Sequence, residues 1–436
     1  MKGGGTAFPR GAADILAIGF GTSAAAWGAG YVCRLPAVAV PSGAVLALVV
    51  LCFLGGGVVA GRFAGRGARG GAYAGLLAGL VNLLVLGSLL GGDRPNEIVP
   101  SALLWLPGSV VLTAALGAAG AAIGARLRRP TAAPADWTAA FARVAAGATF
   151  LLIIVGGVVT SAKAGLSVVD WPNSFGYNMF LYPLSRMTGG IYYEHAHRLF
   201  GSLIGLTTVV LAVHLHRVET RRWVRRLSLV AVAMVVAQGV LGGLRVTGKL
   251  TLSQDPAATS PNIALAVIHG ALGQLFFATM VALAAFTSPT FKGPAGPARA
   301  RHAGTDRLLA PAAVGLLFVQ LVLGAIQRHL AHGLMVHVAM AVVVAPVAVA
   351  AGLRAWGINR DDRLLGPLGA TLAGLAGVQV VLGLGAYAVV GMAESGALPQ
   401  GLRLAVATAH QATGALLLAS AVLVAVWTYR RLSPEA

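Results

Sequence analysis

Six consecutive residues, Tyr193-Glu194-His195-Ala196-His197-Arg198, combine an acid, two imidazoles and a guanidinium beside a long apolar run. The whole chain is only 10% charged. Ionisable groups at the edge of a bilayer are costly to place, so their presence indicates a functional site. Imidazoles bind metals and carboxylates transfer protons, and both kinds of chemistry are therefore candidates here.

Histidines elsewhere in the chain extend this pattern. Seven of the ten fall at the same ends of their predicted helices: residues 195, 197, 269, 329, 332, 337 and 410. Four of these begin predicted helices, namely His197, His269, His337 and His410. One membrane histidine alone is most simply a helix-to-helix hydrogen bond. Four at one depth, two in each half of a repeat, match bis-imidazole ligation of haem iron, whereas zinc would require more ligands in each half.

Glu194 distinguishes the first half of this pattern from the second. It lies three residues before His197, so both share one helix face if the helix has begun by Tyr193. A carboxylate at that position suits proton transfer, although an acid favoured by the helix dipole is the simpler alternative. Leu334 is the equivalent residue before His337. We therefore expect a reactive first site and a structural or electron-relaying second site.

Basic residues near the histidines are candidate partners for haem propionates. Arg198 is the first candidate, with headgroup snorkelling as the alternative. Arg328, Lys163 and Arg245 are weaker candidates. His195 has no assigned role, and its replacement is expected to be mild.

Twelve apolar runs, each long enough to cross a bilayer, position these residues. They span about 14–32, 43–61, 71–91, 102–125, 139–161, 197–216, 227–246, 264–287, 308–327, 334–353, 364–390 and 405–428. Lys and Arg gather in alternate loops, which predicts a multi-pass protein of a bacterial-type inner membrane with both termini cytoplasmic. The histidine ends then face outward. The net charge of +19 is explained by these loops, and no nucleic-acid partner is expected. Cys33 and Cys52 form no disulfide framework.

The last eight spans form an internal repeat. His197 and His337 are separated by 140 residues, while His269 and His410, and the Gln238 and Gln379 that begin matching Gln-x-Val-Leu-Gly motifs, are separated by 141. A further copy of this motif begins at Gln320. The fold class predicted is an all-α integral membrane protein with two tandem pseudo-symmetric four-helix bundles, residues 138–290 and 305–431, preceded by a four-span extension, residues 1–130. Only the first bundle has a long loop between its first two helices (161–193, against 328–333 in the second). Nothing in the sequence assigns a role to the extension.

Four motifs in this part of the chain are specific enough to compare with a known family. They are Val159-Thr160-Ser161-Ala-Lys163-Ala-Gly165-Leu166-Ser167-Val-Val-Asp170-Trp171-Pro172, Glu194-His-Ala-His197-Arg198, His269-Gly-Ala-Leu-Gly273-Gln274 and His410-Gln-Ala-Thr-Gly414-Ala. Residues of about 140–430 thereby resemble the heme A synthases, and the extension lies outside the resemblance.

The resemblance implies an oxidoreductase that converts a ring methyl of haem O to the formyl group of haem A by successive hydroxylations, for cytochrome oxidase. It implies that His197 and His269 hold the substrate haem with Glu194 as the essential acid, and that His337 and His410 hold heme b. Implied partners are haem O, membrane lipid, haem O synthase, cytochrome oxidase assembly factors and an unidentified electron acceptor. The sequence does not decide whether the chain forms a homo-oligomer.

The chain departs from the family pattern at three places. Lys163 replaces a small residue, the cysteine pair carried by some members is missing, and the short loop at 328–333 lets His332 or His329 compete with His337. The constant repeat offset favours His337. Two other functions remain open: a b-type diheme cytochrome exchanging electrons with quinone, and a transporter.

Overall fold

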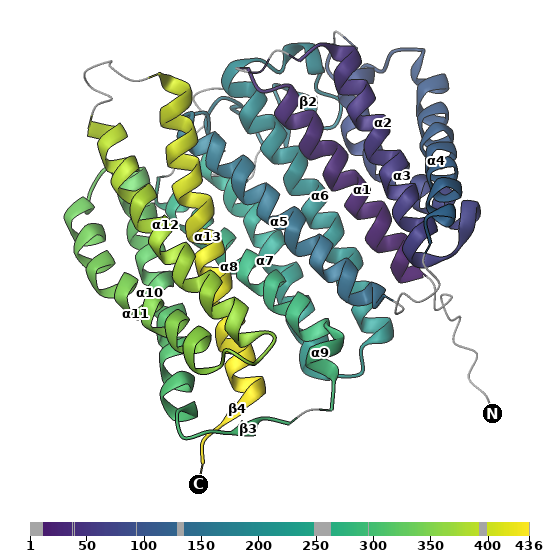
Figure 1. Ribbon diagram of the computed structural model, residues 1–436. Helices are drawn as coiled ribbons and strands as arrows, with labels where there is room; N and C mark the ends of the chain where they lie inside the picture. The colour runs from purple at the N-terminus through teal and green to yellow at the C-terminus, as the bar shows by residue number, and fades with distance from the viewer. Residues whose placement is uncertain are drawn as a thin grey trace. The chain divides into compact units, whose positions relative to one another are not determined.

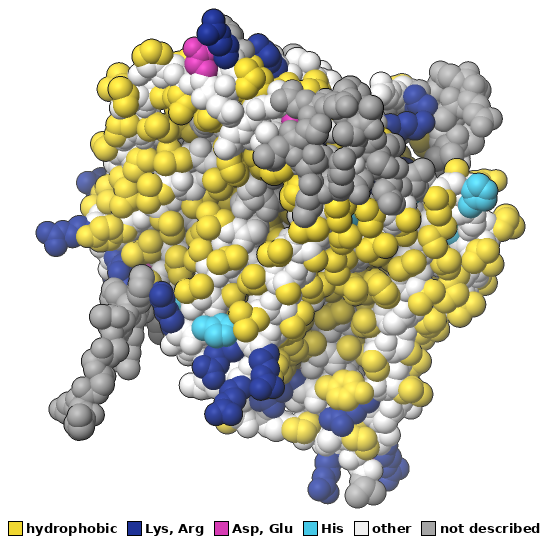
Figure 2. All heavy atoms as spheres, turned by 180° about the vertical axis from the view of Figure 1, so that it is seen from behind, with side chains coloured by type: hydrophobic (Ala, Val, Ile, Leu, Met, Phe, Trp, Pro, Cys, Tyr) yellow, Lys and Arg dark blue, Asp and Glu magenta, His cyan; other side chains and the backbone are white. Residues whose placement is uncertain are grey.

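The computed structural model of this chain describes residues 12–435 apart from 37, 39, 93, 129–134, 248–262, 295 and 392–398. Among the described residues, twelve helices are long and apolar enough to cross a membrane. The chain is therefore an all-α integral membrane protein, as predicted. On the face shown in Figure 2, hydrophobic side chains cover much of the surface. Asp93, Asp255 and Glu394, which the sequence places in the loops opposite the basic ones, lie outside the described residues.

The long helices carry nearly all of the regular structure (Figure 1). Their bounds are α1 Ala12–Cys33, α2 Ser42–Val59, α3 Gly67–Leu90, α4 Ala102–Arg126, α5 Trp137–Ser161, α6 Gly189–Val218, α7 Arg222–Thr247, α8 Ile263–Thr287, α10 Ala303–Leu330, α11 Leu334–Ile358, α12 Leu365–Gly391 and α13 Gln400–Arg431. Shorter elements are η1 Ala60–Ala64, β1 Asn173–Ser174, β2 Tyr177–Asn178, η2 Leu184–Arg186, α9 Pro289–Lys292, β3 Ala298–Arg299 and β4 Leu432–Ser433. The largest difference from the predicted spans is at α6, which begins about two turns before residue 197.

Two compact units divide the chain. Unit 1 contains Met1–Ala148 and Pro172–Val232, and unit 2 contains Thr149–Trp171 and Ala233–Ala436. The four-span extension lies wholly in unit 1, and the predicted second bundle lies wholly in unit 2. The predicted first bundle contributes to both units, because the division passes through α5 and α7.

Glycine sets the packing of the extension in unit 1. A Cβ atom added at Gly71 of α3 would clash with the carbonyl oxygen of Gly117 of α4, and one added at Gly117 would clash with that of Gly71. Helices without a hydrophobic driving force between them associate through such small residues, which let the backbones approach closely. Polar contacts add to this packing: Trp27 Nε1 donates to Asn82 Oδ1 at 3.0 Å, and Arg66 pairs with Asp14 at 2.7 Å.

A tight hairpin opens the long loop before α6, also in unit 1. Strands β1 and β2 pair antiparallel, with Asn173 opposite Asn178 and Ser174 opposite Tyr177. The two residues between them, Phe175 and Gly176, have φ values of 51° and 77°. Two consecutive positive φ angles define a type I′ turn, which suits the twist of a two-residue hairpin. We call residues 172–188, from this hairpin to the start of α6, the hairpin loop.

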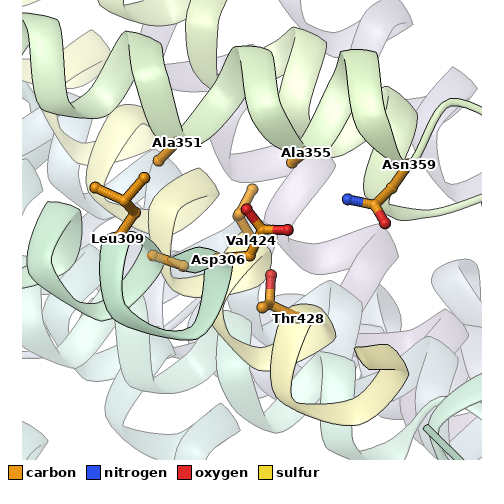
Figure 3. Close-up of a pocket in the computed structure, with 8 residues that line it drawn as sticks. Asp306, Leu309, Ala351, Ala355, Asn359, Val424 and Thr428 are labelled. Carbon is orange, nitrogen blue, oxygen red and sulfur yellow. The ribbon is translucent and has the colours of Figure 1, made fainter. Parts of the chain in front are cut away.

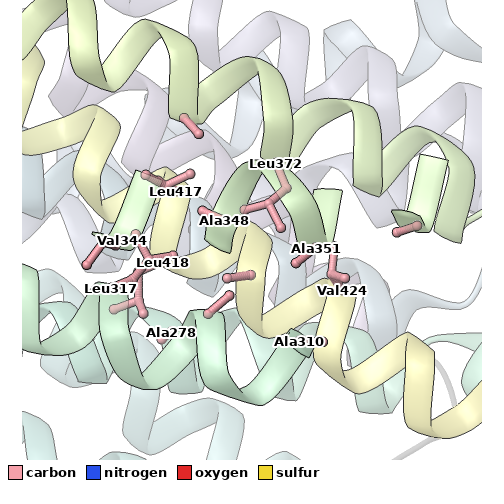
Figure 4. Close-up of a cluster of buried hydrophobic side chains, with 14 residues drawn as sticks. Ala278, Ala310, Leu317, Val344, Ala348, Ala351, Leu372, Leu417, Leu418 and Val424 are labelled. Carbon is pink, nitrogen blue, oxygen red and sulfur yellow. The ribbon is translucent and has the colours of Figure 1, made fainter. Parts of the chain in front are cut away.

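Alanine, leucine and valine form the main core of unit 2, between α8, α10, α11, α12 and α13 (Figure 4). Leu317 of α10, Leu372 of α12 and Leu418 of α13 are all buried in it. The α10–α11 connection is three residues, with Ala331 at φ 53° and Gly333 at φ 89°. This short connection fixes where α11 begins relative to the end of α10.

A polar cluster closes the other end of α10. Asp306, in its first turn, pairs with Arg354 of α11 at 2.8 Å and lines a small pocket with Thr428 and Asn359 (Figure 3). Nearby, β3 and β4 pair in parallel and join residues 298–299 to the end of α13. This end of unit 2 is therefore fastened by an ion pair and a backbone ladder.

Candidate functional site

Helix α6 carries the acid and histidine cluster that the sequence singled out. Because the helix begins at Gly189, Glu194 and His197 both lie inside it, and their spacing of three places them on one face as predicted. Glu194 Oε1 pairs with Arg198 Nη2 at 2.9 Å, and both side chains are at least nine-tenths buried. The acid is therefore held in place by its own helix, one turn along.

Arg198 also links α6 to the hairpin loop. Its Nη1 donates to the carbonyl oxygen of Asn173 at 2.9 Å. Arg198 thus binds both the acid of its own helix and the backbone of the hairpin loop. The predicted pairing of Arg198 with a propionate stays a prediction.

His195 corrects one expectation. Its side chain is fully buried, its Nδ1 lies 3.0 Å from Ser174 Oγ, and its ring centre lies 5.0 Å from that of Tyr182. The residue fastens the hairpin loop to α6. Its replacement should therefore not be mild, because a cavity and an unpaired buried hydroxyl would remain.

We expect His195→Ala to lower the free energy of unfolding by about 2–4 kcal/mol, the sum of a lost buried ring and a lost hydrogen bond. His216→Ala, on the exposed side of the same helix, is the matched control and should cost under about 0.5 kcal/mol. Thermal unfolding of the purified protein in detergent measures both. Equal melting temperatures for the two variants would contradict the fastening role.

His337 of α11 and His410 of α13 face each other in unit 2. Their ring centres are 6.5 Å apart and their planes are nearly perpendicular, at 87°. Metal–imidazole bonds are about 2 Å long, which places the ring centres of two imidazoles on one metal about 6 Å apart. The spacing of this pair therefore fits two axial ligands of one haem iron.

The Gln-x-Val-Leu-Gly motif has a direct structural meaning around these histidines. Gln320 Nε2 donates to the carbonyl oxygen of His337 at 2.9 Å and lies 3.1 Å from its Nδ1. A Cβ atom at Gly324, four residues later, would lie 3.0 Å from His337 Cε1. The glutamine thus holds the start of the next helix, while the glycine leaves room for the imidazole.

The other two copies of the motif also place their glutamine beside a histidine, through the backbone carbonyl in one copy and through the ring in the other. Gln238 Nε2 donates to the His269 carbonyl at 3.0 Å, and Gln379 Nε2 lies 3.5 Å from His410 Nε2. Cβ atoms at Gly242 and Gly383 would lie 3.5 and 3.2 Å from the corresponding Cε1 atoms. Sequence reasoning found these glutamines as repeat landmarks and missed them as site residues. Their constant spacing to a glycine was the available signal.

The remaining predicted site residues in unit 2 lie near the α10–α11 connection and the turn after α5. His332 is exposed, and its Nδ1 lies 2.6 Å from the Leu330 carbonyl. Arg328 Nη2 donates to Ser161 Oγ at 2.8 Å. The Arg245 guanidinium lies where a Cβ atom on Gly165 would stand. His337, and not His332, thus faces His410, although iron binding by this pair stays a prediction.

The predicted first ligand pair falls in different units. His197 belongs to unit 1, and His269 belongs to unit 2. His269 has the glutamine and glycine setting of its motif. Lys163, with a φ of 54°, forms the turn after α5. Joint binding of a substrate haem by His197 and His269 stays a prediction.

Comparison with known families identifies the middle of the chain. Residues 139–338 match the COX15-CtaA family model, whose description is cytochrome oxidase assembly protein. The match covers α5 to the start of α11 and includes Glu194, His197, His269 and His337. The extension and His410 lie beyond it. No curated protein matches the chain.

Proposed function

We propose that this chain, whose residues 139–338 belong to the COX15-CtaA family of cytochrome oxidase assembly proteins, is a haem A synthase. It would be an oxidoreductase that converts a ring methyl of haem O to the formyl group of haem A. Two hydroxylations each remove two electrons and add one oxygen at that carbon. Loss of water from the resulting diol leaves the formyl group.

The observation that carries the proposal is the facing pair of His337 and His410, combined with the family match. Their separation, and the glycines that make room for both rings, fit bis-imidazole binding of heme b. A heme b held there would supply one-electron transfer. Gln320 and Gln379 would orient the two ligand helices, as hydrogen-bonding groups behind metal ligands do.

Glu194 supports a reactive role for the first half of the repeat. Its carboxylate is buried and held by Arg198, three residues from His197, whereas Leu334 stands at the corresponding place in the second half. Glu194 would take up and release protons at the reacting carbon. His197 and His269 would hold haem O.

The protein would act in a bacterial-type inner membrane with its haem sites toward the outer face. Its substrate would come from the lipid phase or from a haem O synthase. Its product would pass to cytochrome oxidase assembly factors, and a separate electron acceptor would be needed. A homo-oligomer is compatible with these roles.

Haem extraction tests the proposal. The chain is co-expressed with a haem O source, and the extracted haems are separated and identified by mass. The expected result is a formyl haem that is absent when the chain is not expressed, together with heme b in the purified protein. Purified protein that binds haem but yields no oxidised product would favour the second candidate, a b-type diheme cytochrome, which the facing histidines also suit. Protein without any haem would overturn both.

A further inference from the structure

We propose that the four-span extension positions the hairpin loop over the Glu194–Arg198 segment and thereby keeps a partly oxidised haem in place until the second hydroxylation. The retention of a partly oxidised haem rests on the proposed function, whereas the positioning of the hairpin loop by the extension does not. All the residues concerned lie in unit 1.

The first support is the contact between the extension and the hairpin loop. Cβ atoms added at Gly87 and Gly91, at the end of α3, would clash with the carbonyl oxygens of Phe180 and Leu181. The loop backbone therefore rests directly on the glycine backbone of α3. Because any side chain there would push the loop away, these two glycines determine how closely the loop backbone packs on the end of α3.

Asn96 adds a hydrogen bond to this contact. Its Oδ1 accepts from the backbone N–H of Asn178 in β2 at 2.8 Å. Asn96 has a φ of 63°, a left-handed conformation that asparagine tolerates well. Its turn is closed by Gly92 N–H donating to the carbonyl of Glu97 at 2.8 Å. The extension thus presents a preformed acceptor to an otherwise open strand edge.

The opposite side of the hairpin loop contacts α6. Asn173 accepts from Arg198, and Ser174 bonds His195. These two residues are in β1, and Asn178, which bonds the extension, is in the strand paired with it. A displacement of the loop by the extension would therefore reach Arg198, the partner of Glu194.

Aromatic contacts fix the extension against α6 itself. Tyr31 of α1 stacks on Tyr192 of α6 with ring centres 5.6 Å apart and an angle of 10°. Tyr192 donates its hydroxyl to the Tyr31 carbonyl at 2.7 Å. Trp27 also contacts Phe200 edge-on at 5.6 Å. The extension therefore contacts both the hairpin loop and α6. It acts as a frame that fixes the position of the loop relative to α6.

This frame matters for a reaction with two successive oxidations at one carbon. The singly hydroxylated haem must stay bound after the first step, and closed loops retain intermediates and exclude water. A loop that is displaced by the extension would release the alcohol early. The ratio of alcohol to formyl haem therefore reports the loop position, whereas a general loss of folded protein would lower both products together.

Gly87→Ala and Gly91→Ala test the proposal in the full chain. Gly87 is helical, and Gly91 has a φ of −66°, so alanine is compatible with both backbones. Any effect must then come from the contact with the loop. Gly30→Ala in α1 and Gly55→Ala in α2 are matched controls, because a Cβ atom there would meet nothing within 4 Å.

Two measurements are made on each variant: the rate of tryptic cleavage after the exposed Arg186 of the hairpin loop, in detergent, and the alcohol-to-formyl ratio of the extracted haem. We expect cleavage about tenfold faster in the two test variants, because overpacking opens the loop, and a several-fold higher ratio. The controls should match the unchanged protein.

Cleavage at the unchanged rate in both test variants would overturn the proposal. Faster cleavage with an unchanged product ratio would overturn the role in retaining the intermediate. If the unchanged protein forms no oxidised haem, the proposed function fails, and the cleavage rates alone then decide whether the extension positions the loop.

Discussion

Glu194→Gln is expected to stop the formation of haem A while heme b stays bound to the second half of the repeat. Proton transfer by a positioned carboxylate typically contributes about 10²–10⁴-fold to a rate, and both successive oxidations would be slowed. Glutamine keeps the size of the side chain and an oxygen that can accept from Arg198. The amide carries no charge, however, so the buried Arg198 cation loses its counter-charge, and part of the cost of about 3–5 kcal/mol for breaking a buried ion pair remains.

Glu219→Gln is the matched control for this prediction. Glu219 is the residue directly after the end of α6. Its side chain is buried like that of Glu194, and it pairs with Arg221 at 2.7 Å. It lies at the other end of the helix from Glu194. Its replacement should leave haem A formation unchanged. Mass analysis of extracted haems measures the product, and the absorption spectrum of the purified protein measures heme b.

Formyl haem at the unchanged level in Glu194→Gln would remove this residue from the reaction. Loss of heme b in the same variant would show that the substitution damages the fold instead. The expected pattern, oxidation lost and heme b retained, is one that neither outcome produces.

His337→Ala and His410→Ala are each expected to abolish binding of heme b. The two rings face each other at 6.5 Å, so removing either leaves iron with one protein ligand. Changing a group behind a metal ligand typically weakens binding about 10–100-fold, and removing the ligand itself should exceed that range. Gln320→Leu, which removes the bond to the His337 carbonyl, should fall within it.

His332→Ala is the control, because that residue is exposed and bonds only a turn carbonyl in the contacts observed. It should retain heme b. Titration of the purified variants with haem, followed by absorption spectroscopy, measures the affinities. Loss of heme b in His332→Ala with retention in His337→Ala would show that the repeat offset identified the wrong histidine.

The sequence predicted the number of spans and the ends at which the histidines lie, because apolar length and histidine spacing are local signals. It placed the start of α6 too late. The residues from Gly189 to Ala196 include charged and aromatic groups that interrupt the apolar pattern, and in the structure they are packed by the hairpin loop through His195 and by α1 through Tyr192.

Contacts between distant parts of the chain could not be predicted in this way. The role of His195 depends on Ser174, and Asn178 meets Asn96, 82 residues earlier. Gly87 and Gly91 have no feature that separates them from the many other glycines of the chain. Their importance comes from the carbonyl groups that approach them, which only the structure locates.

The perpendicular orientation of the His337 and His410 rings would also affect the electronic structure of a haem iron bound between them. Each imidazole raises the energy of one of the two iron dπ orbitals, the one that matches the orientation of its ring. Parallel rings raise the same orbital and split the pair, whereas perpendicular rings raise both and keep them nearly equal. A ferric haem between rings so oriented would be a low-spin centre with strong magnetic anisotropy. The angle between the two rings would thus be visible in an electron paramagnetic resonance spectrum.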